Sequence, residues 1–130
     1  MTTYAYGARR IVCLTEETTE ALYLMGEQDR IVGISGFTVR PAIARKEKPK
    51  VSAFISAKID KILALKPDLV LAFSDMQADI TAELVKAGLQ VHVFNQRSVS
   101  EIFEMLYTLG ALIGEPAKAA ALVLEYEKNI

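Results

Sequence analysis

The sequence predicts an α/β fold, a three-layer α/β/α sandwich with a Rossmann-like central parallel sheet of about four strands. The first observation is the stretch 59–73, IDKILALKPDLVLAF, where a helical pattern stops at Pro67 and an unbroken apolar run follows. A strand with one wet face alternates, so the run at 69–73 indicates a strand buried on both faces. The second observation is that strand-like and helix-like segments alternate, which favours parallel pairing with right-handed crossovers.

Length and composition bound the class of protein. The chain has 130 residues, 52% hydrophobic and 24% charged, which suits one globular domain with a core. The formal net charge of −1 gives no electrostatic footprint for nucleic acid or an anionic membrane. No apolar run approaches the roughly 18 residues of a membrane span, and the first ten residues lack the apolar core of a signal peptide. We therefore expect no nucleic-acid partner, no membrane insertion, and a cytoplasmic location unless a signal was removed.

The strand-like segments differ in how they are patterned. The segments 11–14 and 31–34 are continuous apolar runs, as is the central run at 69–73. The segment 89–94 alternates more, so it is expected at a sheet edge or half covered. The segment 51–55 is expected to be only a short extended piece.

Helices are expected between these strands. Three carry N-terminal signals: Ser56 can cap a helix from Ile59, and Ser74-Asp75-Met76-Gln77 and Ser98-Val99-Ser100-Glu101 fit capping boxes. A helix ending near Met25 follows the first strand, and another follows Pro116, whose fixed φ suits a first turn. On that last helix Ala117, Ala120, Ala121 and Leu124 form one stripe. The polar, basic stretch 35–50 is expected to be a surface excursion.

In a parallel sheet the loops after the strands meet at one edge, where open α/β folds bind ligands. The aromatic residues near these strand ends suggest an apolar wall with a polar fringe, although packing under loops accounts for them equally well. The acids there also suit helix N-termini through the macrodipole. The expected ligand-facing residues are Thr15, Glu16, Glu17, Thr18, Phe37, Phe54, Phe73, Ser74, Asp75, Met76, Asn95, Gln96 and Arg97.

Two other functions remain alternatives at this point. Acids after the first strand and Asp75 after the central strand suggest a receiver-like regulatory domain, although a receiver's aspartate ends the strand itself. A flavodoxin-like small-molecule enzyme shares the layout, but no catalytic pair, GxGxxG or GxxxxGK[ST] is present. The single histidine, His92, lies mid-strand, which disfavours a transition-metal site. Cys13 is likewise mid-strand and is expected to be a buried, inert thiol.

Four segments resemble one known family: RIVCLTEETTEALYLMGEQDRIVGI, KPKVSAF, IDKILALKPDLVLAF and GEPAKAAALVLEYEKNI. Together they resemble the N-terminal lobe of the cobalamin and ferric-siderophore substrate-binding proteins of ABC importers, the class with a helical linker. The resemblance covers nearly the whole chain from Arg9, and KILALKPDLVLA is its most specific part. It implies a ligand-binding protein rather than an enzyme, a corrinoid or iron chelate as ligand, no resident cofactor, and a periplasmic location.

The resemblance also implies an organisation. It divides the chain into a tail (residues 1–8), an α/β lobe (9–115) and the start of an inter-lobe linker helix (116–130), with the second lobe absent. In this family an acidic residue on each lobe docks on the permease, and Asp60 falls at that place, where glutamate is more usual. Phe37 and Phe54 would stand for the larger aromatics of a cobalamin cleft. With one lobe missing, we expect the chain to self-associate, most simply as a homodimer.

Overall fold

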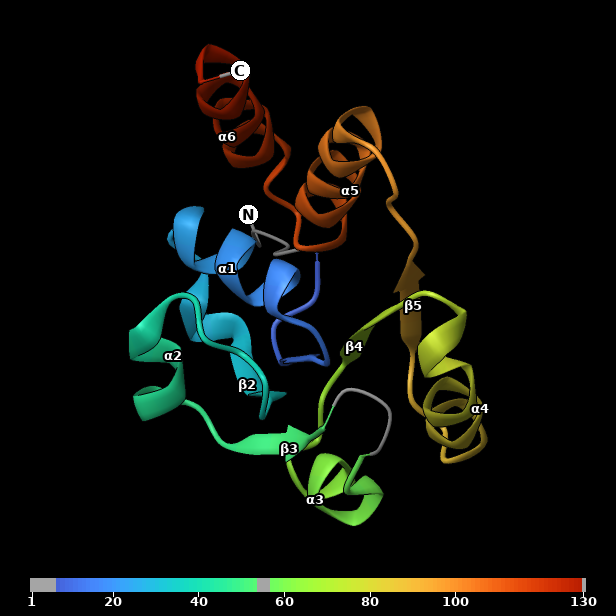
Figure 1. Ribbon diagram of the computed structural model, residues 1–130. Helices are drawn as coiled ribbons and strands as arrows, with labels where there is room; N and C mark the ends of the chain where they lie inside the picture. Colours follow the sequence, from blue (N-terminus) through green and yellow to red (C-terminus); the bar gives the residue numbers. More distant parts are fainter. Residues whose placement is uncertain (1–6, 54–56, 130) are drawn as a thin grey trace, which may run out of the picture. The chain divides into compact units, whose positions relative to one another are not determined.

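The computed structural model describes residues 7–53 and 57–129 (Figure 1). The chain divides into two compact units, one of residues 9–95 and one of residues 1–8 with 96–130. The first unit contains the whole sheet, and the second contains the last two helices. The expected limits at residues 8 and 115 stay predictions.

The described residues form a sheet of five parallel strands in the order β3-β2-β1-β4-β5. Their bounds are β1 Ile11–Cys13, β2 Ile31–Ser35, β3 Lys50–Ser52, β4 Leu69–Phe73 and β5 Val91–Phe94. The expected count of about four is exceeded because the short extended segment pairs with β2. The segment that alternates, now β5, lies at a sheet edge as predicted, since an edge strand needs less apolar cover. The α/β fold with a central parallel sheet is confirmed.

The helices occupy the connections that the sequence indicated. In the first unit they are α1 Glu16–Leu24, α2 Ala42–Glu47, α3 Ile59–Ala64 and α4 Ala78–Lys86, with short 3-10 turns at Gln28–Arg30 and Asp75–Gln77. In the second unit they are α5 Val99–Leu112 and α6 Pro116–Lys128. No helix of the described residues is long and apolar enough to cross a membrane.

The core forms on both faces of the central strands. On one face Val12, Val70 and Ala72 pack with Ile62 of α3 and Leu84 of α4, all nearly or fully buried. On the other face the fully buried Cys13 side chain lies beside Thr18 and Thr19, so α1 covers that side. Helices on both faces explain why β4 is apolar at every position.

The residues Lys66-Pro67-Asp68, which belong to the segment 59–73 that carries the family resemblance, tie the amino ends of β1 and β4 together. The Asp68 carboxylate accepts hydrogen bonds from the backbone N–H groups of Arg9 and Arg10, at 2.8 and 3.0 Å. The Arg10 guanidinium donates in return to the carbonyls of Leu65 and Lys66. Lys66 has a positive φ of 52°, which turns the chain sharply before Pro67. These three residues belong to the most specific part of the resemblance. They align β1 with β4 at the amino ends of the strands, away from the carboxyl edge.

In the second unit α5 and α6 pack closely at Gly110. A Cβ placed on Gly110 would lie 2.4 Å from the Ala119 Cβ, so only glycine allows this approach. The buried residues of α6 are Ala119, Leu122 and Val123. Of the stripe expected on this helix, Ala120 is partly buried, while Ala117, Ala121 and Leu124 are exposed, because α6 turns a different face to α5. Self-association through this helix stays a prediction.

Candidate functional site

The loops at the carboxyl edge of the sheet contain most of the expected ligand-facing residues. Because all five strands are parallel, the segments after β1, β2, β4 and β5 share this edge. They bring Thr15–Thr18, Phe37, Ser74–Met76 and Asn95 to it, with Phe73 ending β4. Phe54 lies outside the described residues. Gln96 and Arg97 belong to the second unit.

The loop after β1 is largely internal. Thr15 and Thr18 are buried, and the Thr18 and Thr19 hydroxyls donate to the Thr15 carbonyl at 3.4 and 3.2 Å. These bonds tie the first turn of α1 to Thr15, the residue that precedes the helix. Of the four residues expected here, only Glu16 and Glu17 reach the surface.

Glu16 anchors the neighbouring loop rather than standing open at the edge. Its carboxylate accepts hydrogen bonds from the backbone N–H groups of Val39 and Arg40, at 2.7 and 3.0 Å, and pairs with the Arg40 guanidinium at 3.2 Å. Partial burial opposes ionisation, but these bonds outweigh it and hold the pKa of Glu16 below its ordinary value. The Arg40 guanidinium also lies 3.6 Å from a Glu20 oxygen.

The loop after β2 is fixed by side-chain hydrogen bonds and presents apolar groups outward. The Arg45 guanidinium donates to the carbonyls of Gly36 and Thr38, at 2.6 and 2.9 Å. The Ser35 hydroxyl accepts from the Phe37 N–H at 3.2 Å. With the backbone fixed in this way, the Phe37 side chain is 66% exposed. An exposed aromatic on a fixed loop is suited to contacting a large apolar ligand.

A buried glutamine closes the crevice between β1 and β4, where the strand order reverses direction. The Gln77 side chain is fully buried. Its amide oxygen accepts from the Phe73 N–H at 2.8 Å, and its amide nitrogen donates to the Leu14 carbonyl at 3.1 Å. It therefore joins the carboxyl ends of two strands. Sequence reasoning missed this role because it assigned Gln77 to a capping box.

The capping box predicted at Ser74–Gln77 is wrong. The Ser74 hydroxyl accepts from the Met76 N–H at 3.1 Å, and the glutamine side chain bonds to Phe73 rather than back to Ser74. Ser74 has φ 58° and ψ 177°, a conformation that residues with a side chain rarely adopt. This turn leaves Asp75 and Met76 exposed, the latter by 61%.

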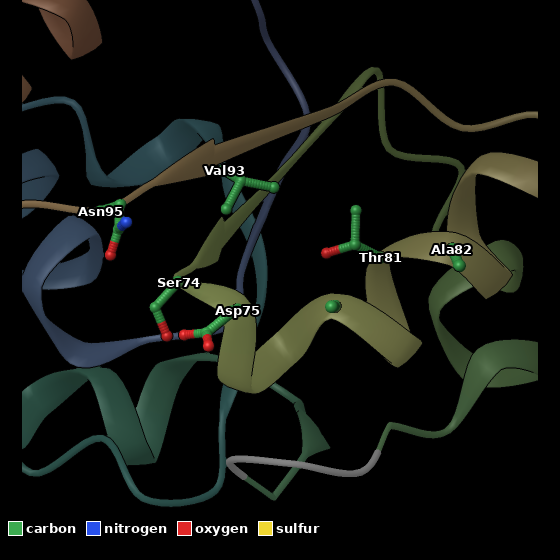
Figure 2. Close-up of a pocket in the computed structure, with 7 residues that line it drawn as sticks. Ser74, Asp75, Thr81, Ala82, Val93 and Asn95 are labelled. Carbon is green, nitrogen blue, oxygen red and sulfur yellow. The ribbon is translucent and has the colours of Figure 1, made fainter.

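A hollow of about 340 Å³ lies beside β5 at this turn (Figure 2). It is lined by Ser74, Asp75, Ala78, Thr81, Ala82, Val93 and Asn95. Figure 2 shows Ser74, Asp75 and Asn95 at one end and Thr81 and Ala82 at the other. Three residues expected to face a ligand therefore also border this hollow, which sequence reasoning did not foresee.

The sequence singled out four other polar or reactive side chains: Gln96, Arg97, His92 and Cys13. Gln96 is partly buried, and the Arg97 N–H donates to the Glu101 carboxylate at 3.0 Å within the N-terminal cap of α5. Burial lowers the pKa of His92, whose ring packs against Phe94 with centroids 4.4 Å apart. Burial also raises the pKa of the Cys13 thiol to about 11, which keeps it protonated. Among the described residues, no group of three or more His, Cys, Asp or Glu side chains could hold a metal.

Comparison with known proteins identifies relatives of this chain. The chain is 31% identical over 128 residues to an uncharacterized ABC transporter substrate-binding lipoprotein of Bacillus subtilis, covering 94% of this chain and 40% of that protein. It is 26% identical over 132 residues to a vitamin B12-binding protein of Yersinia pestis, covering all of this chain and 46% of that protein. The chain thus spans less than half the length of these curated relatives.

Solved structures show the same fold. A periplasmic vitamin B12 binding protein of Vibrio cholerae matches 95% of this chain with a TM-score of 0.83 and 25% identity, over 48% of its own length. A periplasmic solute-binding protein of Staphylococcus epidermidis matches 95% with a TM-score of 0.86 and 27% identity, over 49% of its length. The sequence profile of the family described as periplasmic binding protein matches residues 11–130. The chain therefore belongs to the periplasmic binding protein family.

Proposed function

We propose that this chain is a ligand-binding lobe of a substrate-binding protein that serves an ABC importer, with a corrinoid or an iron chelate as its ligand. The relatives are ABC substrate-binding and vitamin B12-binding proteins, which supports the class of function. Because the family consists of substrate-binding proteins, we propose binding rather than catalysis for this chain. By the same likeness we propose that the protein works in the periplasm or at the outer face of the membrane.

The observation that carries the proposal is the form of the carboxyl edge. In open α/β enzymes a small ligand enters the crevice where the strand order reverses. Here Gln77 fills that crevice, while Phe37 and Met76 remain exposed on the loops beside it. A ligand would therefore lie across the edge and contact a broad apolar surface. A large corrinoid or chelate, held from its other side by a second lobe, suits such an edge.

The wall of this site can be tested at Phe37. Replacing it by alanine should weaken binding of the ligand by about 1 to 3 kcal/mol, the scale for burying one large apolar side chain. The measurement is calorimetric titration of the full-length gene product with each of three compounds: cyanocobalamin, a ferric hydroxamate siderophore and haemin. Val85→Ala is the matched control, because Val85 is 55% exposed on α4 and is not an edge residue. If none of the three compounds binds the unaltered protein, the proposed function is wrong.

We also propose that Asp60 is the docking carboxylate for the permease. It lies exposed in the first turn of α3. Asp60→Arg should abolish stimulation of the cognate permease's ATPase activity, because a cation replaces the anion that a basic surface attracts. Asp60→Ala should change the melting temperature little, since exposed charges contribute roughly 0 to 1 kcal/mol. Asp79→Arg makes the same charge change in the first turn of α4. An equal loss of ATPase stimulation in both arginine variants would contradict a specific role for Asp60.

A further inference from the structure

We propose that Glu16 and Arg45 are positioning residues, which clamp the loop of residues 36–40 from two helices and hold Phe37 in place for the ligand. The inference rests on the proposed function and deepens it, because it names the side chains that set the geometry of the apolar wall. Figure 1 shows the loop between β2 and α2, next to α1. All three elements belong to the unit of residues 9–95.

The loop is fixed by hydrogen bonds at every backbone N–H group. The five donors of residues 36–40 have these acceptors: the Ser52 carbonyl for Gly36, the Ser35 hydroxyl and carbonyl for Phe37 and Thr38, and the Glu16 carboxylate for Val39 and Arg40. Backbone groups that are paired in this way limit the local opening of a loop. The path of the loop is therefore set before any ligand arrives.

Glu16 holds the end of the loop from the first turn of α1. One oxygen of its carboxylate accepts from the backbone N–H groups of both Val39 and Arg40, at 2.7 and 3.0 Å. The other oxygen lies 3.2 Å from the Arg40 guanidinium. Hydrogen bonds with a charged partner are roughly twice as strong as neutral ones. Removing this one carboxylate would therefore release two backbone groups at once.

Arg45 holds the residues on either side of Phe37 from α2. Its guanidinium donates to the carbonyls of Gly36 and Thr38, at 2.6 and 2.9 Å. Thr38 is fully buried, whereas Phe37 and Val39 are 66% and 59% exposed. Apolar side chains gain nothing by facing water. The clamp therefore keeps Phe37 outward against the hydrophobic effect, and a ligand that covers this side chain does not have to order it first.

The clamp itself can be tested without a ligand, by amide hydrogen exchange in nuclear magnetic resonance spectra. Glu16→Ala should speed the exchange of the Val39 and Arg40 amide protons about tenfold or more, because their acceptor is removed. The Leu14 amide, which donates to the Leu71 carbonyl, is the reference and should not change. Unchanged exchange at Val39 and Arg40 would overturn the clamp.

The link to binding is tested by a double-mutant cycle with Phe37→Ala. The full-length gene product is titrated with cyanocobalamin, a ferric hydroxamate siderophore and haemin, and the compound bound most tightly is used for the variants. Glu16→Ala and Arg45→Ala should each weaken its binding about two- to tenfold, the range for a side chain that must be ordered on binding. In the Phe37→Ala background each should change the affinity by less than about twofold, because the aromatic group that they position is gone.

Matched and conservative variants separate positioning from general effects. Glu83→Ala and Lys46→Ala remove one charge from exposed positions of α4 and α2, and both should bind as the unaltered protein does. Glu16→Gln and Arg45→Lys keep a hydrogen-bonding group at the same place, so each should recover part of the affinity lost in the alanine variant. Equal losses with and without Phe37 would overturn the proposal while leaving the proposed function intact. Failure of the unaltered protein to bind any of the three compounds would instead overturn the proposed function, and the role of the clamp in binding with it.

Discussion

Replacing Gln77 by leucine should lower the free energy of unfolding by about 2 to 5 kcal/mol. The substitution leaves the Phe73 N–H and the Leu14 carbonyl inside the protein without their side-chain partner, and each such orphaned group costs about 1 to 3 kcal/mol. Leucine has a similar volume, so the loss reports the hydrogen bonds rather than a cavity. The measurement is urea denaturation followed by far-ultraviolet circular dichroism.

Two further variants make the result specific. Gln77→Glu keeps an acceptor for Phe73 but cannot donate to Leu14 when ionised, and it places a charge in a fully buried position. Its destabilisation should therefore shrink as the pH falls and the carboxyl group gains a proton. Gln90→Leu makes the same change at an exposed position beside β5 and should be close to neutral. If Gln77→Leu unfolds at the same urea concentration as Gln90→Leu, the bridge between β1 and β4 contributes little.

Gly110→Ala should destabilise the protein by about 1 to 3 kcal/mol, the usual cost of an overpacked contact. At an exposed helical position the same change would stabilise by about 1 kcal/mol, because alanine is the better helix former. The sign is reversed here because the new methyl group would lie 2.4 Å from the Ala119 Cβ and force α5 and α6 apart.

The compensating change at the facing residue provides the control. Gly110→Ala combined with Ala119→Gly moves the single methyl group from one helix to the other. The double variant should recover most of the lost stability, after allowance for the lower helix propensity of glycine in α6. If the two substitutions are simply additive in urea denaturation, the close approach of α5 and α6 does not limit stability.

The sequence was sufficient to predict the fold where local pattern and tertiary environment agree. The apolar run at 69–73 became a strand buried on both faces, and the more alternating segment became the edge strand β5. The pairing of Lys50–Ser52 with β2 was not foreseen, because a three-residue strand has too few positions to show a period.

The candidate site was harder to predict because polar side chains have several partners to choose from. Ser74 and Gln77 have the spacing of a capping box. The same sequence pattern results whether the glutamine caps a helix or bridges two strands, so the pattern alone does not distinguish the two roles. Glu16 suited a ligand role, but its partners Val39 and Arg40 come from a loop whose path only the folded chain defines. The hollow beside β5 could not be predicted either, because it depends on how α4 packs against β5.

The central place of β1 in the sheet has a consequence for biosynthesis. Ile11 pairs with Ile31 on one side and with Leu69 on the other, so the ribosome delivers the two partners of β1 at very different times. A nascent chain can assemble β1, β2 and β3 early, but the second edge of β1 stays unpaired until β4 emerges. An open apolar edge invites pairing with other chains during that interval. Chaperone protection of this protein would therefore matter most while the segment between β3 and β4 is being translated.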